Sequence, residues 1–404
     1  MSEFKERVER GQSATFSRVD GDLFLDGGTV TGAGGALEVT GTVYVKHSST
    51  VKGSLRAEIV RGDGSLSIEG NLDATEVRLD NGASLEVIGN LNAESVDVPR
   101  FLKVGGLTNV EDMRVGGHAE FRGDAKVEDI KVGGTLTSSG LLSGEDINVG
   151  GTIRAKNINA EDIKIGGTLT AEEVHAESVR AGGTVEISGK ADIEELMVGG
   201  TVLLEGGKVG DARVGGTLRA SGPLEFDEFD VGGRMDLESG TGGQVRVGGL
   251  LDVRNDLSLS DGLRVGGQAN VGGNLKAESI VVGGDLEADT VTAEEELTVG
   301  RSLTTKGGAK AETINIGRHG KVRGPIVAET VKVGKDAEIE DVHAENLRLE
   351  QGCVAGNVYV KDGEFEDGCR IRGKLLYTER VGIGRNVQLS SQAEKVGNLP
   401  SPPI

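Results

Sequence analysis

A Val-Gly-Gly signature that returns at almost constant intervals constrains this chain more than any other feature. The apolar residue before the first glycine recurs every 16 to 18 residues across more than 200 residues. Repetition at a fixed short period is typical of solenoids, in which each turn stacks on the one before it. The repeated positions are Val115, Val132, Val149, Ile165, Ala181, Val198, Val214, Val231, Val247, Val265, Val282, Val299, Ile316 and Val333.

Within each period, apolar residues come in pairs that are two positions apart. Ile158 with Ala160 and Ile163 with Ile165 are examples, and two or three polar or glycine residues separate the pairs. A spacing of two places both members on one face of a β-strand, whereas a helix would require spacings of three and four. One period therefore predicts three short strands and three corners, which together form one turn of a triangular coil.

These patterns predict an all-β fold, a single long right-handed parallel β-helix with about 17 residues per turn. Right-handedness is expected because parallel crossover connections nearly always have that hand. Glycine at the corners is expected to supply positive φ angles. The expected organisation is a flexible tail at 1–14, a continuous coil at 15–389 and a disordered proline-containing tail at 390–404. The coil subdivides into a less regular part at 15–103, the Val-Gly-Gly repeats at 104–318 and a distinct part at 319–389.

Composition excludes several classes of function. The formal net charge of −21 argues against a nucleic-acid partner, because phosphate binding needs clustered Lys and Arg. Aromatic residues make up only 3 % of the chain, which leaves no aromatic platform for a polysaccharide substrate. We expect no enzymatic activity and no cofactor, because the histidines lack ligand or triad spacing. These are His47, His118, His175, His319 and His343.

An acidic column marks one corner of successive turns, for example at Glu145-Asp146 and Glu161-Asp162. A divalent cation could relieve the repulsion between stacked carboxylates. Lys164 and Arg180 stand within a few residues, however, so we expect a solvated and neutralised ladder with no specific metal.

Two cysteines, Cys353 and Cys369, are 16 residues apart, about one turn. A disulfide between adjacent turns is conceivable, but we expect reduced thiols, since no leader segment is visible and the chain reads as cytoplasmic. Their redox state stays open.

The two ends of the coil are the candidate functional sites. Neither end shows an amphipathic capping helix, and an uncovered turn exposes apolar side chains and strand edges. We expect these ends to dock on one another; the alternative is that the tails fold over and cap them. The expected self-assembly residues are Phe16, Leu23, Phe24, Leu376, Tyr377, Val381, Ile383, Val387 and Leu389, and Met1 and Phe4 are candidates for contact with a membrane surface.

The segment from His319 to Leu389 resembles a known family. It reads Gly-Lys-Val-Arg-Gly-Pro-Ile-Val-Ala-Glu-Thr-Val-Lys-Val-Gly from Gly320, Ala-Glu-Ile-Glu-Asp-Val-His-Ala-Glu-Asn-Leu from Ala337 and Arg-Ile-Arg-Gly-Lys-Leu from Arg370. This is similar to the bactofilins, polymer-forming cytoskeletal proteins of prokaryotes with a right-handed triangular β-helix. The resemblance implies nucleotide-independent filaments that often lie on membranes. This coil is several times longer than the usual bactofilin domain.

The sequence therefore predicts a non-enzymatic scaffold that assembles end to end with copies of itself, organises an unknown protein cargo and associates with a membrane through its N-terminus. The alternative is a monomeric spacer or adhesin that binds partners along its side faces. A third hypothesis is an enzyme similar to the hexapeptide-repeat acyltransferases, which would require trimers and a histidine-lined cleft.

Overall fold

A computed structural model of the chain describes residues 4–404. Every regular element in this part of the chain is a β-strand, so no described helix is long and apolar enough to cross a membrane. The chain divides into two units, Met1–Glu205 and Gly206–Ile404, and each is a coil of stacked turns. Met1, a candidate for membrane contact, lies outside the described residues.

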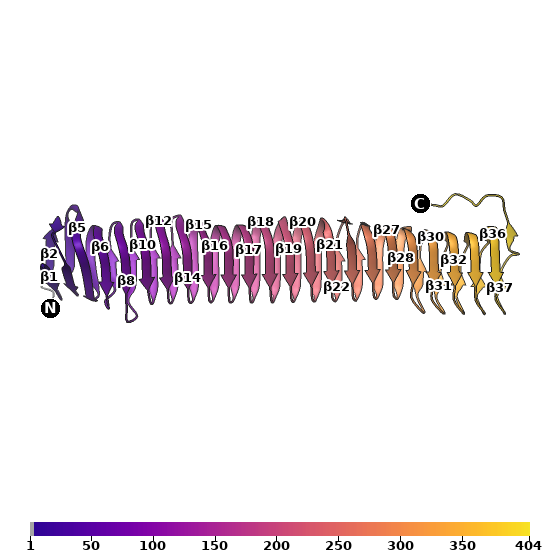
Figure 1. Ribbon diagram of the computed structural model, residues 1–404, viewed down its shortest axis with the longest axis horizontal. Coiled ribbons are helices and arrows are strands. Elements are labelled where there is room, and N and C mark those ends of the chain that lie inside the picture. Colours follow the sequence, from indigo (N-terminus) through magenta and orange to yellow (C-terminus); the bar gives the residue numbers. More distant parts are fainter. Residues whose placement is uncertain (1–3) are drawn as a thin grey trace. The chain divides into compact units, whose positions relative to one another are not determined.

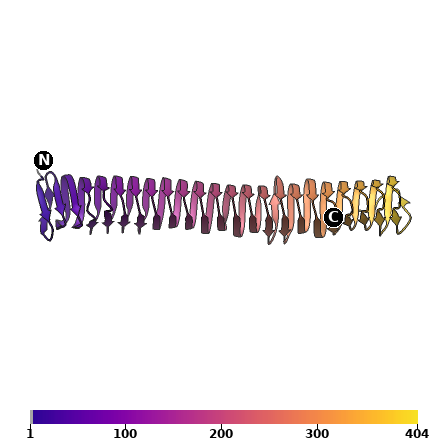
Figure 2. The same ribbon diagram turned by 90° about the horizontal axis from the view of Figure 1, so that it is seen from below.

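The strands of the first unit run parallel to the strands one turn before and after them (Figures 1 and 2). They are β1 (Glu6–Glu9), β2 (Ser13–Phe16), β3 (Arg18–Val19), β4 (Leu23–Asp26), β5 (Thr29–His47), β6 (Ser49–Gly62), β7 (Leu66–Ile68), β8 (Leu72–Leu79), β9 (Ser84–Val87), β10 (Leu91–Val98), β11 (Phe101–Val104), β12 (Thr108–Val115), β13 (His118–Phe121), β14 (Ala125–Val132), β15 (Thr135–Val149), β16 (Thr152–Ile165), β17 (Thr168–Ala181) and β18 (Thr184–Val198).

The strand β19 (Thr201–Val214) contains the boundary between the units, and the second unit continues with the same parallel pairing. Its strands are β20 (Thr217–Val231), β21 (Arg234–Val247), β22 (Leu250–Val253), β23 (Leu257–Leu259), β24 (Gly262–Val265), β25 (Gln268–Val271), β26 (Asn274–Val282), β27 (Asp285–Val299), β28 (Ser302–Ile316), β29 (Lys321–Arg323), β30 (Ile326–Val333), β31 (Glu338–Ile339), β32 (Val342–Leu349), β33 (Val354–Ala355), β34 (Val358–Phe365), β35 (Arg370–Ile371), β36 (Leu375–Ile383), β37 (Gln388–Leu389) and β38 (Glu394–Lys395).

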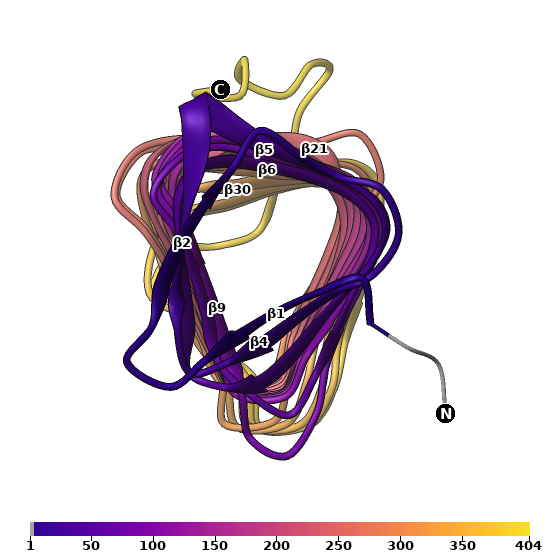
Figure 3. The ribbon, with the colours of Figure 1, turned by 90° about the vertical axis from the view of Figure 1, so that its left-hand side faces the viewer.

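The register between turns confirms the predicted parallel solenoid with about 17 residues per turn. Thr108 of β12 lies opposite Leu91 of β10 on one side and Ala125 of β14 on the other. The first turns enclose a triangular interior (Figure 3). Seen from the N-terminal end, β1, β2 and β5 follow one another clockwise as the chain recedes, which is the predicted right-handed sense.

Burial alternates along the strands as the two-residue spacing predicts. In β16, Ile153, Ile158 and Ile163 are fully buried while Arg154 and Asn159 are exposed. Inward side chains from successive turns therefore form continuous apolar columns, and this burial contributes most of the stability of each unit.

The Val-Gly-Gly corners need glycine for a reason that differs from the expected one. None of the Val-Gly-Gly glycines is among the residues of 4–404 that have positive φ. Instead, a Cβ placed on Gly166 would lie 2.1 Å from the carbonyl oxygen of Gly150, one turn earlier. Gly150 and Gly133 have the same relation, at 2.4 Å. The corner glycines are thus required by the close stacking of corner backbones, and the expectation of positive φ was wrong for them.

A second set of corners is closed by Asn and Asp side chains that bond to the next turn. Oδ1 of Asn71 accepts a hydrogen bond from the backbone N–H of Asn90 at 2.9 Å, and Oδ1 of Asn90 accepts one from Leu107 at 2.9 Å. A Cβ on Gly106 would lie 2.3 Å from Oδ1 of Asn90, so a glycine must precede the donor. These bonds satisfy corner amides that have no strand partner. The same arrangement recurs at Asp124, Asp256, Asp341, Asn357 and Asp367.

A large side chain lies opposite a glycine of the next turn at one aromatic ring of the interior. In the second unit, Phe226 stacks on Phe229 with ring centroids 4.3 Å apart. Phe226 lies opposite Gly242 of the next turn, and a Cβ on that glycine would lie 2.3 Å from the ring. Volume is therefore balanced between neighbouring turns, as close packing of an interior requires.

The close stacking of the Val-Gly-Gly corners predicts that a single added methyl group destabilises the fold. Gly166→Ala should lower the free energy of unfolding by about 1–3 kcal/mol, because the new Cβ must displace the Gly150 carbonyl. Gly397→Ala is the control, because nothing lies within 4 Å of its Cβ position. Thermal unfolding followed by circular dichroism measures both, and equal stability of the two variants would contradict the account.

The volume balance predicts coupling between Phe226 and Gly242. Each of Phe226→Leu and Gly242→Ala should destabilise the second unit. The double variant should lose about 1 kcal/mol less free energy of unfolding than the sum of the two single losses, because the smaller leucine side chain makes room for the new methyl group. Phe226→Leu combined with Gly397→Ala should be additive. Denaturant unfolding of the single and double variants measures these free energies. If both pairs of substitutions were additive, the proposed balance of volume between Phe226 and Gly242 would be wrong.

Candidate functional site

The first turn of the coil starts earlier in the sequence than predicted. Residues 4–14 were expected to form a flexible tail, yet β1 pairs in parallel with β4, and Val8 lies opposite Leu25. Val8 is only 1 % exposed. Sequence reasoning missed this turn because Val8 is a single apolar residue between Arg7 and Glu9, so no pair of apolar residues two positions apart marks the strand.

Ionic and hydrogen-bond contacts hold this first turn against the following ones. Arg7 forms an ion pair with Asp26 at 3.6 Å, and Nδ1 of His47 donates a hydrogen bond to the same carboxylate. The pKa of Asp26 lies below its usual value, chiefly because of this hydrogen bond from His47, with the charges of Lys46 and Arg7 adding to it. The carboxylate therefore stays ionised and keeps its partners over the whole neutral range.

The ring of Phe4 packs on the outer side of the coil. It lies 4.7 Å from the ring of Phe24 and 4.9 Å from that of Tyr44, between centroids. The guanidinium groups of Arg7 and Arg61 cover the rings of Phe24 and Tyr44 at 4.8 and 4.5 Å. Phe4 is thus engaged by the protein's own side chains, and its contact with a membrane stays a prediction.

The self-assembly residues expected at the N-terminal end occupy different positions. Leu23 is fully buried beneath the first turn, and Phe24 points outward because Leu23 and Leu25 on either side point inward. Phe16 of β2 is half-buried and lies opposite Gly32 of the next turn. Of the three residues, Phe16 alone belongs to the outermost inward-facing layer.

The last turn of the second unit leaves part of its inward-facing layer uncovered. Val381 and Ile383 of β36 lie opposite Gly363 and Phe365 of β34, and Leu389 of β37 lies opposite Ile371. Phe365 is 1 % exposed, whereas Ile383, at the same position one turn later, is 50 % exposed. We define the terminal apolar face as Val381, Ile383, Val387 and Leu389.

Two further predicted residues lie beside this face. Tyr377 lies opposite Val360 and therefore continues an inward column, but Lys395 of β38 pairs with it and covers that strand. Leu376 lies opposite Tyr359 on the outer surface, so it does not belong to the end. Because neighbouring residues of a strand face opposite sides, the sequence could have predicted that Leu376 and Tyr377 point in different directions. No sequence pattern predicted that β38 covers part of this strand.

The segment after residue 390 was expected to be disordered, and the structure places it along the second unit. After β38 the chain runs back beside earlier turns (Figure 1). Cδ1 of Ile404 lies 2.7 Å from the position that a Cβ on Gly308 would take, and Pro403 lines a groove with Pro325 and Arg372. Apart from β38, the tail therefore leaves the terminal apolar face open.

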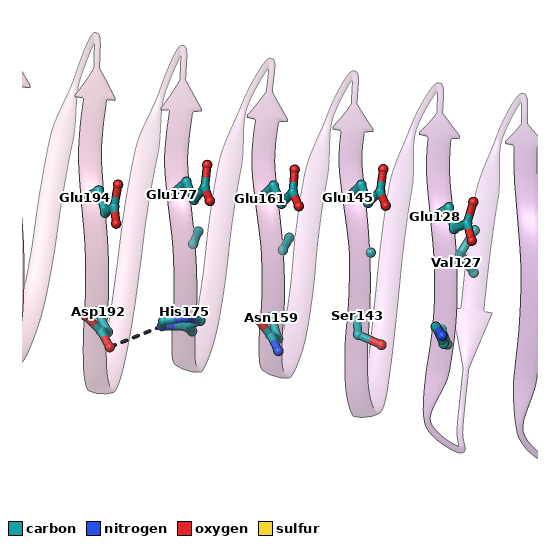
Figure 4. A pocket seen from close by; sticks show the side chains of 14 residues that line it. Val127, Glu128, Ser143, Glu145, Asn159, Glu161, His175, Glu177, Asp192 and Glu194 are labelled. Atoms are coloured by element: carbon teal, nitrogen blue, oxygen red, sulfur yellow. Dashed lines mark hydrogen bonds and ion pairs between the residues drawn. The ribbon is translucent and has the colours of Figure 1, made fainter.

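A row of glutamates lines a groove on the first unit (Figure 4). The groove has a volume of about 460 Å³, and its floor and walls come from successive turns. Nowhere in residues 4–404 do three or more His, Cys, Asp or Glu side chains form a group able to hold a metal ion. The row consists of Glu128, Glu145, Glu161, Glu177 and Glu194.

These glutamates belong to the predicted acidic column, and other carboxylates of that column are paired with basic side chains. Lys164 lies 3.5 Å from Asp146 and 3.8 Å from Asp162, and Arg180 bridges Asp162 and Glu195 at 3.1 and 2.9 Å. These pairs are solvent-exposed, so each contributes about 0–1 kcal/mol. Their main effect is to remove the repulsion that stacked carboxylates would otherwise produce.

Together, the fold and its open end define a parallel β-solenoid repeat protein. Comparison with known proteins adds nothing more specific, since no family model, curated protein or solved structure matches the chain.

The packing of Phe4 predicts that this side chain secures the first turn. Phe4→Ala should accelerate hydrogen exchange of the β1 amides by about tenfold, because aromatic pairs contribute about 0.5–1.5 kcal/mol beyond their buried area. Leu107→Ala, at a position 57 % exposed, is the control. Unchanged β1 exchange in the Phe4 variant would contradict this role.

Proposed function

We propose that this protein is a non-enzymatic scaffold of the cytoskeletal type, which assembles end to end without nucleotide through its terminal apolar face. The observation that carries the proposal is the contrast between Phe365 and Ile383 in one column. The first is covered by the following turn, and the second has no turn above it.

The driving force would be the same as that which stacks the turns within each unit. A fully exposed Ile or Leu side chain contributes about 1.5–3 kcal/mol when it is buried, and a bare strand edge offers unpaired amides and carbonyls. Association of two molecules costs about 4–15 kcal/mol. Because Val381, Val387 and Leu389 are already half-buried and only Ile383 is strongly exposed, the face and one continued ladder give a contact of modest affinity, and assembly should depend strongly on protein concentration.

The geometry of the contact decides between a filament and a closed dimer. Docking of the terminal apolar face on the first turn of another molecule, where Phe16 is half-buried, is a head-to-tail contact that can continue indefinitely. Docking of two terminal apolar faces would be symmetric and would stop at a dimer. The parallel ladder favours the first arrangement, because only that one continues the parallel strand direction.

The resemblance of residues 319–389 to the bactofilins supports this function, because bactofilins form filaments without nucleotide. It also supports a cytoplasmic location and membrane association through the N-terminal segment. The cargo that such a scaffold would organise is an unidentified protein.

The alternative function is a monomeric spacer that binds partners along its side faces. The groove lined by Glu128, Glu161 and Glu194 favours this alternative, because its row of glutamates presents a negative charge on each successive turn. A spacer would stay monomeric at all concentrations, so a measurement of assembly as a function of protein concentration separates the two functions.

The test is to place charge on the terminal apolar face. The double variant Ile383→Glu with Leu389→Glu should keep the circular dichroism spectrum of the wild type yet lose concentration-dependent assembly. The physical reason is that carboxylates buried at the contact lack partners. Light scattering and negative-stain electron microscopy measure assembly.

The matched control is Ile88→Glu, which introduces the same charge at a side position that is 53 % exposed. This variant should assemble like the wild type. If the wild type stays monomeric at high concentration, or if Ile88→Glu abolishes assembly as strongly as the double variant, the proposal fails.

A further inference from the structure

Two buried cysteines occupy equivalent positions on adjacent turns of the second unit. Val354 of β33 lies opposite Arg370 of β35, and the Arg370 N–H donates a hydrogen bond to the carbonyl of Cys353 at 2.8 Å. Cys353 and Cys369, each one residue earlier, are therefore stacked. Both are 0 % exposed, and both side chains contribute to the interior.

This stacking suits a disulfide bond. Neighbouring parallel strands lie about 4.8 Å apart. A disulfide joins residues whose Cα atoms are about 4.4–6.8 Å apart, so the backbone is already at bridging distance. The side chains also leave the backbone in the same direction, because parallel in-register residues face the same way.

Each thiol has a defined set of polar neighbours. Sγ of Cys353 can donate to the carbonyl oxygen of Gly334 at 3.1 Å, and Sγ of Cys369 can donate to that of Glu350 at 3.1 Å. The Cys353 proton can also turn toward Cys369. This hydrogen bond lowers the pKa of Cys369 and, together with burial, raises that of Cys353. Cys369 is therefore the thiol that ionises first.

We propose that Cys353 and Cys369 form a reversible intramolecular disulfide when the protein meets hydrogen peroxide. The Cys369 thiolate attacks one peroxide oxygen, which gives a sulfenic acid and, after protonation, one water. The sulfur of Cys353 then attacks the Cys369 sulfur, loses its proton and expels the second water. Two thiols and one peroxide thus become one disulfide and two waters, and the peroxide is reduced by two electrons.

The position of Cys369 gives the oxidant a route. It lies one turn beneath the terminal turn, and Gln388 of that turn bonds through its N–H to the carbonyl of Cys369. Beyond the short pairing of β38 with Leu376 and Tyr377, the terminal turn has a neighbouring turn on only one side, so its local opening should cost less free energy than that of a turn covered on both sides. Opening of the terminal turn exposes Cys369, whereas Cys353 stays covered by the turn that carries Cys369.

The disulfide would covalently link the turn that contains Cys353 to the next turn, which contains Cys369. It closes a loop of 15 residues, 354–368, between the two cysteines. By the loop-entropy account of disulfides, opening of this loop should become up to about 100-fold rarer. The inference does not rest on end-to-end assembly, since it requires only the stacked thiols.

The experiment treats the reduced full-length chain with hydrogen peroxide under native conditions, followed by iodoacetamide, proteolysis and mass spectrometry. We expect both thiols to disappear together and a cross-linked peptide pair containing Cys353 and Cys369 to form within single chains. Dithiothreitol should restore both thiols. Hydrogen exchange of residues 354–368 should be slower in the oxidised chain.

Single variants assign the two roles. Cys353→Ser should leave a sulfenic acid on Cys369 that dimedone labels, and Cys369→Ser should slow oxidation of Cys353 by at least about tenfold. Circular dichroism verifies folding, and Cys353→Ala and Cys369→Ala replace any serine variant that fails to fold. Three results would overturn the proposal. The thiols could stay reduced in the folded chain, they could oxidise separately to sulfinic acids, or they could form disulfides only between different chains.

Discussion

The stacking of one turn on the next is the interaction on which the rest of this structure depends. No single turn can bury its own inward side chains, because its interior is only as thick as one strand. Each turn is therefore stable only through its neighbours, and every inward residue is covered by the residue one turn away. This explains why the interior consists of Val, Ile, Leu and Ala at two-residue spacing and why aromatic rings are rare. At Phe226 the next turn provides a glycine opposite the ring.

Close stacking also determines which residues the corners can contain. Corners that lie directly above one another bring backbone carbonyls to the place where a Cβ would be, so the Val-Gly-Gly glycines are a consequence of distance and not of unusual φ angles. Other corners use Asn or Asp to bond to the next amide, which again needs a glycine beside it. Both devices keep neighbouring turns at the strand spacing, and both would be lost if the turns moved apart.

Much of the fold was predictable from sequence because its contacts repeat at a constant separation. The period placed Ile153, Ile158 and Ile163 inside, and it placed Ile383 and Leu389 on the last inward layer. The sequence did not reveal the first turn around Val8, since one apolar residue has no visible period. It also did not reveal the outward position of Phe24, the return of the chain toward Gly308 or the cover that Lys395 provides over Tyr377. These features depend on contacts between segments that the repeat does not relate.

The central claim is that the part of the last turn formed by residues 381–389 has no neighbour on its outer side. Hydrogen exchange measured as a function of protein concentration tests this most directly. In dilute protein, amides at the outer edge of 381–389 should exchange far faster than those of 354–365, and they should gain protection as concentration rises. Full protection of that edge in dilute monomer would show that something already covers it, and the account would then be wrong.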